Sequence, residues 1–276
     1  MLALIYVAVL VAVPLVVIVG KVAGAGWSEL AAALSSPSAV TAYRLTAEVS
    51  LIAVVLNTVF GVGFGLLLTR YRLPGRRLLS AVADLPISVS PIVAGLALVL
   101  VYGPVDGWFG TDLADAGIRV IYSLPGMVLA TTFVSFPLVL REIVPVLDEA
   151  GTDMEQAARV LGANAWQQFV RITLPTIRPA LSYGVVLSLA RSLGEFGAVR
   201  VVSGGISGAG QTQTVTLLIE DKYTQLEGGT YQLALLLVVV TVAAIVVASL
   251  RRDKVAPGGE RGVREHRGTR DLQAVR

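Results

Sequence analysis

Five apolar stretches of about 20 residues limit, more than any other feature of the sequence, what this chain can fold into. They are residues 2–20, 45–69, 79–102, 124–147 and 231–250. An α-helix needs about 20 apolar residues to cross a bilayer, and it pairs its own backbone groups there. A sixth stretch, residues 181–202, is apolar except for Arg191, Glu195 and Arg200, and polar segments flank it. We therefore predict an all-α membrane protein with six transmembrane helices.

The composition agrees with a surface that faces lipid. Only 15% of the residues are charged, 55% are hydrophobic, and the mean hydropathy is +0.75. A soluble domain carries roughly 25% charged residues. The chain has no cysteine, which excludes disulfides and thiolate metal sites, and its one histidine, His266, lies in the polar C-terminal tail. We expect no metal site and no catalytic residues in the membrane-spanning part.

Arginine is distributed unevenly among the predicted loops. The connection from Arg70 to Arg77 holds four arginines in eight residues, and the tail opens with Arg251 and Arg252. The loop of residues 103–123 holds three aspartates and one arginine, and that of residues 204–230 holds one lysine. Because positive charge accumulates in cytoplasmic loops, we predict that both termini lie in the cytoplasm.

The net charge of +3 belongs to the C-terminal tail. From Arg251 onward the chain has eight basic and four acidic residues and few apolar ones. This composition is typical of a disordered segment beside anionic lipid, and it does not indicate a nucleic-acid surface. We divide the chain into a first transmembrane helix with an external segment (1–43), a transmembrane core (44–250) and a basic cytoplasmic tail (251–276).

The cytoplasmic loop between the fourth and fifth apolar stretches has an ordered pattern of helix signals. Thr152 and Glu155 have the spacing of a capping box, and Gly162 is free to end the helix that follows. A second helical segment over residues 165–172 is expected to stop at Pro175. The pattern predicts a compact helix–turn–helix that docks on a partner, and a plain connector is the alternative.

The same loop, residues 148–179, resembles the EAA loop of ABC importer permeases. That pattern is Glu-Ala-Ala, three residues, Gly, nine residues, Ile, one residue and Leu-Pro. The residues that match it are Ala157, Ala158, Gly162, Ile172, Leu174 and Pro175. Gln156 stands where the family usually has Glu, although Glu155 keeps a carboxylate beside it and is a candidate substitute.

The resemblance implies a type I ABC importer permease whose loop couples it to a separate dimer of ATPase subunits. ATP and Mg would be bound by that partner. The chain itself has no Gly-x-x-x-x-Gly-Lys-Ser/Thr loop, because the glycines between Gly61 and Gly65 lie in an apolar stretch without lysine. We therefore expect no nucleotide-binding site and no enzymatic activity in this chain.

Further segments are similar to sulfate permeases, in particular those of the W type. The likeness runs from about Thr41 to Leu250, and the segments that carry it are residues 84–91, 141–142, 193–198 and 211–218. It implies a multi-pass protein of a prokaryotic plasma membrane that imports sulfate or thiosulfate. The partners implied are a second, homologous permease in a heterodimer and an extracytoplasmic sulfate-binding protein. Molybdate and tungstate permeases share the loop, so these anions are the alternative.

Charged and polar residues inside the predicted spans are candidates for a translocation pathway. Arg191 and Glu195 are four residues apart, so they share one helical face. They either form an ion pair that fixes one helix against another, or they line the pathway of an anion. Ser88 and Ser90 lie between two prolines, where a kinked helix beside an aqueous cavity and a simple packing kink are both possible. An ion-driven secondary transporter would also use charges in the membrane midplane, but the EAA-like loop argues against it.

Overall fold

The computed structural model describes residues 2–71, 73–206 and 212–255. Within these ranges the regular elements are all helices. Most of the predicted basic tail, including His266, lies outside the described residues, as do Arg72 and Gln211.

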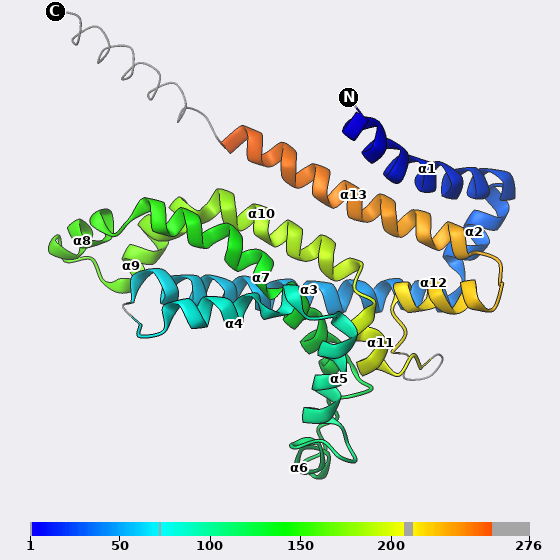
Figure 1. Ribbon diagram of the computed structural model, residues 1–276, viewed down its shortest axis with the longest axis horizontal. Helices are drawn as coiled ribbons and strands as arrows, with labels where there is room; N and C mark the ends of the chain where they lie inside the picture. Colours follow the sequence, from blue (N-terminus) through cyan, green and yellow to red (C-terminus); the bar gives the residue numbers. More distant parts are fainter. Residues whose placement is uncertain (1, 72, 207–211, 256–276) are drawn as a thin grey trace, which may run out of the picture.

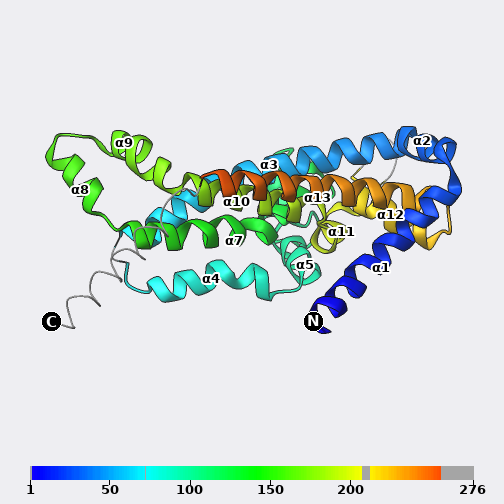
Figure 2. The ribbon, with the colours of Figure 1, turned by 90° about the horizontal axis from the view of Figure 1, so that it is seen from above.

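Long helices running in roughly the same direction make up the body of the molecule (Figures 1 and 2). They are α1 (Leu2–Ala25), α3 (Pro37–Arg70), α7 (Leu124–Ala150), α10 (Leu174–Leu193) and α13 (Thr230–Val255). Four spans in the described chain are long and apolar enough to cross a membrane: Ala8–Ala25, Pro37–Arg70, Leu124–Ala150 and Ala165–Leu193. The predictions of an all-helical fold and of these apolar helices are confirmed.

The third predicted span, residues 79–102, is not one straight helix. It consists of α4 (Arg76–Ser88) and α5 (Pro91–Tyr102), which are bent by 110° at the break. Pro91 disfavours the helical conformation in the residue before it, and Ser90 accordingly has an extended ψ of 133°. In Figure 1, α5 leaves the bundle of long helices. The expected kink is thus a full break in the helix.

The fifth predicted span, residues 181–202, is wrong in its bounds. Helix α10 ends at Leu193, and the short helix α11 (Gly197–Ser203) follows. In the other direction α10 is continued by α9 (Ala165–Gln168) and by a π-helical turn, η1 (Phe169–Thr173), so that the span covers Ala165–Leu193. At this break the Glu195 carboxylate accepts a hydrogen bond from the Ala198 amide, a backbone donor in the first turn of α11.

Four shorter helices connect these elements: α2 (Trp27–Ser35), α6 (Gly110–Asp115), α8 (Asp153–Val160) and α12 (Val215–Thr224). In α13 the apolar segment Thr230–Val246 is followed in the sequence by the mostly apolar residues 247–250. By length and composition the described chain has four membrane-crossing helices, or five if α4 and α5 count as one. The count of six spans and the cytoplasmic position of the termini remain predictions.

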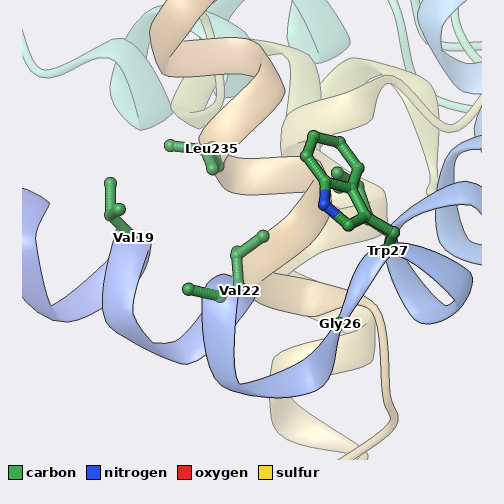
Figure 3. A pocket seen from close by; sticks show the side chains of 7 residues that line it. Val19, Val22, Gly26, Trp27 and Leu235 are labelled. Atoms are coloured by element: carbon green, nitrogen blue, oxygen red, sulfur yellow. The ribbon is translucent and has the colours of Figure 1, made fainter.

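Helix α1 joins the body of the protein through one end. An apolar groove of about 310 Å³ lies between α1, α2 and α13, with Val19, Val22 and Trp27 on one side and Leu235 on the other (Figure 3). Gly26, which has a φ of +87°, allows the turn from α1 into α2. Trp27 is 85% exposed, and tryptophan is enriched where a membrane meets water.

Glycines and small polar residues bring the long helices together. A Cβ on Gly61 would lie 3.0 Å from the Val139 side chain, which shows how closely α3 approaches α7. At the same contact the Asn57 amide donates hydrogen bonds to Ser135 of α7 (2.7 Å) and Ser188 of α10 (3.1 Å). This buried polar contact fixes the mutual position of three helices in the middle of the bundle.

Candidate functional site

The loop that resembles the EAA loop forms a helical hairpin beyond the ends of the long helices (Figures 1 and 2). Helix α8 ends before Gly162, whose φ of +86° is the left-handed conformation expected for a glycine that ends a helix. Asn164 and Gln167 then form a capping box that starts α9. The predicted helix–turn–helix and the end of its first helix at Gly162 are confirmed.

The capping box predicted at Thr152 and Glu155 is wrong. Thr152 precedes α8, but its hydroxyl accepts a hydrogen bond from the Gln156 side chain (2.7 Å) and caps no backbone amide. The Glu155 carboxylate turns away toward Arg70. A charged guanidinium is a stronger partner for a carboxylate than a backbone amide is, which explains the different arrangement.

Glu155 and Arg70 form a largely buried ion pair that ties the hairpin to the membrane helices. The Nε atom of Arg70 lies 2.8 Å from a carboxylate oxygen of Glu155, and the two side chains are only 13% and 16% exposed. Arg70 also donates to the Leu147 carbonyl of α7 (3.0 Å), and Thr173 of η1 donates to Glu155 (2.8 Å). We call these four residues the clamp. Gln156, which stands where the family usually has Glu, is exposed. Glu155 instead points inward to Arg70, so its carboxylate does not lie on the surface where that family Glu would be.

Pro175 does not stop the second helix, contrary to the prediction. It lies in the first turn of α10, directly after η1, where Leu174 donates to the carbonyl of Phe169 five residues earlier. The π-helical turn changes the hydrogen-bond register just before the proline, so the chain continues as a helix through a residue that lacks an N–H. Ile172 and Leu174 are half-buried at this junction.

The hairpin exposes large apolar side chains. Val160 and Leu161 are each 88% exposed, Trp166 is 70% exposed and Met154 is 56% exposed. We call these four residues the crest. Ala157 is exposed and Ala158 half-buried, so two small residues accompany the crest. Several large apolar side chains exposed on one short element outside the bundle are typical of a surface that binds another protein.

Arg191 and Glu195 form the ion pair that their spacing predicts. The Glu195 side chain is buried, and its second carboxylate oxygen accepts a hydrogen bond from the amide of Ala198 (3.0 Å). The Glu195 carbonyl accepts another from Thr216 (2.9 Å). The Arg191 side chain, by contrast, is 37% exposed. The pair thus stabilises the break between α10 and α11, and a role of Arg191 in a pathway remains a prediction.

Ser88 and Ser90 are exposed at the break between α4 and α5. This break lies next to the one between α10 and α11, because a Cβ on Gly197 would be 3.0 Å from the Pro91 side chain. The structure therefore brings together the segments that carry both sets of predicted pathway residues. Within the described chain, no hydrogen bond joins the two serines to Arg191 or Glu195.

Two contacts of the site had no signal in the sequence. Arg70 and Glu155 are 85 residues apart, and Asp84 pairs with Arg141 across 57 residues. No helical spacing connects partners so distant along the chain. Among the described residues there is also no group of three His, Cys, Asp or Glu side chains that could hold a metal ion.

Comparisons with known proteins agree with this geometry. The model of the binding-protein-dependent transport system inner membrane component family matches residues 58–255. The sulfate transport system permease protein CysW of Synechococcus elongatus is 45% identical over 248 residues, which cover 90% of this chain and 86% of that protein. CysT of Escherichia coli, named a sulfate transport system permease protein, is 41% identical over 216 residues, which cover 78% of this chain and 77% of that protein.

A solved structure shares the fold at much lower identity. A chain of a bacterial ABC transporter involved in the import of the polysaccharide alginate matches with a TM-score of 0.71 and 18% identity, covering 93% of this chain and 94% of its own length. The helical bundle is therefore the fold found in ABC importers. The chain belongs to the family of binding-protein-dependent transport system inner membrane components.

Proposed function

We propose that this chain is a permease subunit of an ATP-driven importer of sulfate. It would pair with a second, homologous permease, receive sulfate from an extracytoplasmic binding protein, and obtain its energy from a separate ATPase dimer that binds ATP and Mg. Residues 44–250 would form the transporting core. The crest is the observation that carries the proposal.

The crest fits a cytoplasmic protein partner better than it fits lipid. Asp153 and Glu155 flank its Met154, and the polar capping box of Asn164 and Gln167 encloses its Trp166, so charged and polar groups lie beside the crest along the chain. Two neighbouring side chains that are 88% exposed leave much apolar area in contact with water unless a partner covers them. An ATPase subunit with a complementary groove would bury that area, and the clamp would carry its motion to α3 and η1.

Sulfate is proposed because relatives at 41% and 45% identity are named sulfate permeases. The likeness to CysW favours the W type, with a T-type chain as the second permease. Thiosulfate, molybdate and tungstate are the alternatives. Arg191, with its exposed edge, and the serines at the α4–α5 break are the residues that we propose to line the pathway.

ATPase stimulation in the reconstituted complex tests the proposal and its substrate together. Binding protein loaded with sulfate, thiosulfate, molybdate or tungstate is added to the two permeases and the ATPase in lipid. We expect sulfate-loaded protein to stimulate hydrolysis well above unloaded protein. Strong stimulation by molybdate with none by sulfate would contradict the substrate, and a chain that never retains an ATPase subunit would contradict the class.

A further inference from the structure

Helix α4 carries a polar stripe although it lies in an apolar part of the chain. The stripe consists of Arg76, Ser80, Asp84 and Ser88, which are spaced by four residues and therefore lie along one face. Ala83 and Pro86 of the same helix are buried. On the stripe, Ser80 and Ser88 are exposed and Asp84 is half-buried. The stripe ends at the break beside Ser90.

Two ion pairs join this stripe to α7. Arg76 pairs with Asp148 at the ends of the two helices (2.9 Å). Asp84 pairs with Arg141, also at 2.9 Å. In this second pair α4 supplies the acidic residue and α7 the basic one. Arg141 precedes Asp148 by seven residues, which is about 10 Å along a helix. The inner pair therefore lies two turns deeper in the bundle than the outer pair.

The inner pair is not buried within the chain. The side chain of Arg141 is 53% exposed and that of Asp84 is 37% exposed. An arginine or an aspartate that faces lipid in the middle of a membrane helix is strongly unfavourable. Long side chains can reach toward the headgroups, but Asp84 and the two serines are too short to do so. The stripe must therefore face water or polar protein.

Water is the better match for this surface. The stripe runs without a gap from the cytoplasmic end of α4, as oriented by the arginines of residues 70–77, to the break where the predicted pathway serines lie. The hydrogen bond to Asp84 uses Nε of Arg141, and among the described residues its two Nη groups have no other partner. Those nitrogens are the donors with which a guanidinium binds an oxyanion in two-pronged geometry.

We propose that the α4 stripe and Arg141 form the cytoplasmic half of the wall of the translocation pathway, and that Arg141 is the group there that contacts the anion. This inference rests on the proposed function, since it takes an oxyanion as the substrate. Asp84 holds Arg141 in place through Nε and lowers the net charge of the wall. The anion is thereby attracted without being held too tightly to leave.

The absence of cysteine from the chain makes the proposal directly testable. Single cysteines are placed on the stripe (Ser80→Cys, Ser88→Cys) and, as controls, on apolar positions of the same helix (Leu78→Cys, Leu85→Cys). The control positions are themselves 69% and 50% exposed. The assembled complex in membrane vesicles is treated with sulfonatoethyl methanethiosulfonate, a small anionic thiol reagent that does not cross lipid. We expect the stripe cysteines to react at least about tenfold faster than the controls, because thiolates form only in contact with water.

Stripe cysteines that react no faster than Leu78→Cys and Leu85→Cys would overturn the proposal. A second measurement tests the proposal if a cysteine variant fails to assemble. Arg141→Gln is expected to raise the KM for sulfate uptake about tenfold through the loss of a charge-assisted contact, whereas Arg44→Gln, in the exposed Arg44–Glu48 pair of α3, is expected to leave it unchanged. Equal KM values for the two would also overturn the role of Arg141.

The labelling separates this inference from the proposed function. Thiol reactivity reports contact with water, whichever ion is transported. Unreactive stripe cysteines in a complex that imports sulfate would contradict only the pathway wall. Reactive stripe cysteines in a complex that imports no sulfate would contradict the substrate, while the water-lined wall would stand.

Discussion

Among single residues, Glu155 holds the most consequential position, because its carboxylate joins α8 to both α3 and η1. Its carboxylate pairs with Arg70 and accepts a hydrogen bond from Thr173, with little exposure to solvent. Charged groups that are sheltered from water bind each other more strongly than exposed ones do. The clamp is therefore suited to transmit a displacement of α8 into the membrane helices.

Removing the charge of Glu155 should loosen the hairpin. Glu155→Gln leaves Arg70 without its charged partner, and we expect a cost of about 2 kcal/mol. Amides of α8 should then exchange with deuterium about tenfold faster or more in the purified complex. The control is Asp148→Asn, which breaks the pair with Arg76. Both of those side chains are 47% exposed, so the expected cost is below about 1 kcal/mol. Equal exchange in the two variants would contradict the clamp.

At this scale the sequence predicts local partners well and distant ones poorly. The pairing of Arg191 with Glu195 follows from a spacing of four residues. The partner of Glu155 does not follow from spacing. Its carboxylate was expected to cap the start of its own helix, and it pairs instead with Arg70, 85 positions away. Competition between a local backbone amide and a distant guanidinium is decided by the fold that places Arg70 beside Glu155, and a single sequence does not contain that arrangement.

Among the helices, the two breaks that face each other set the shape of the bundle. A Cβ on Gly95 of α5 would lie 2.7 Å from the carbonyl oxygen of Ala198 in α11, so only glycine permits this approach. Residues 79–102 are apolar enough as a whole to predict a single span. The direction of α5 is determined instead by the fit against α11, and for that reason the break was predicted only as a kink.

Widening this contact should destabilise the protein. Gly95→Ala pushes α5 and α11 apart, and overpacking of this kind costs about 1–3 kcal/mol. We expect Tm in detergent to fall by about 5 °C. Gly63→Ala is the matched control, since it lies in α3 and has nothing within 4 Å of an added Cβ. A Tm for Gly95→Ala equal to that of the control would refute the close approach.

The crest predicts where the hairpin meets its partner. Val160→Asp or Leu161→Asp places a charge at the centre of the proposed contact, and we expect retention of the ATPase subunit to fall about 30-fold, as for a binding hot spot. Quantitative co-purification in mild detergent measures it. Leu226→Asp is the control, because Leu226 is 91% exposed but follows α12, at the other end of the molecule (Figure 1). Similar retention in the crest and control variants would count against docking through the crest.

For the whole molecule, the sequence predicts the class well. Apolar stretches of span length and the scarcity of charge lead to a helical membrane protein, and the spacing of the EAA-like loop leads to the permease family. The contacts between polar residues of different helices, by contrast, can be seen only in the structure. The stripe on α4 and Arg141 of α7 are separate features of the sequence, and they become one surface only when the two helices pack together.

Uptake of radiolabelled sulfate into proteoliposomes tests the central claim most directly. The vesicles contain the two permeases and the ATPase, with ATP inside and sulfate-loaded binding protein outside. We predict accumulation of sulfate against its gradient that requires ATP and that is lost when Leu161→Asp replaces the natural chain. Sulfate accumulation that proceeds without ATP, or none at all in a complex that hydrolyses ATP and imports another anion, would contradict the assignment of this chain as a sulfate permease driven by a separate ATPase.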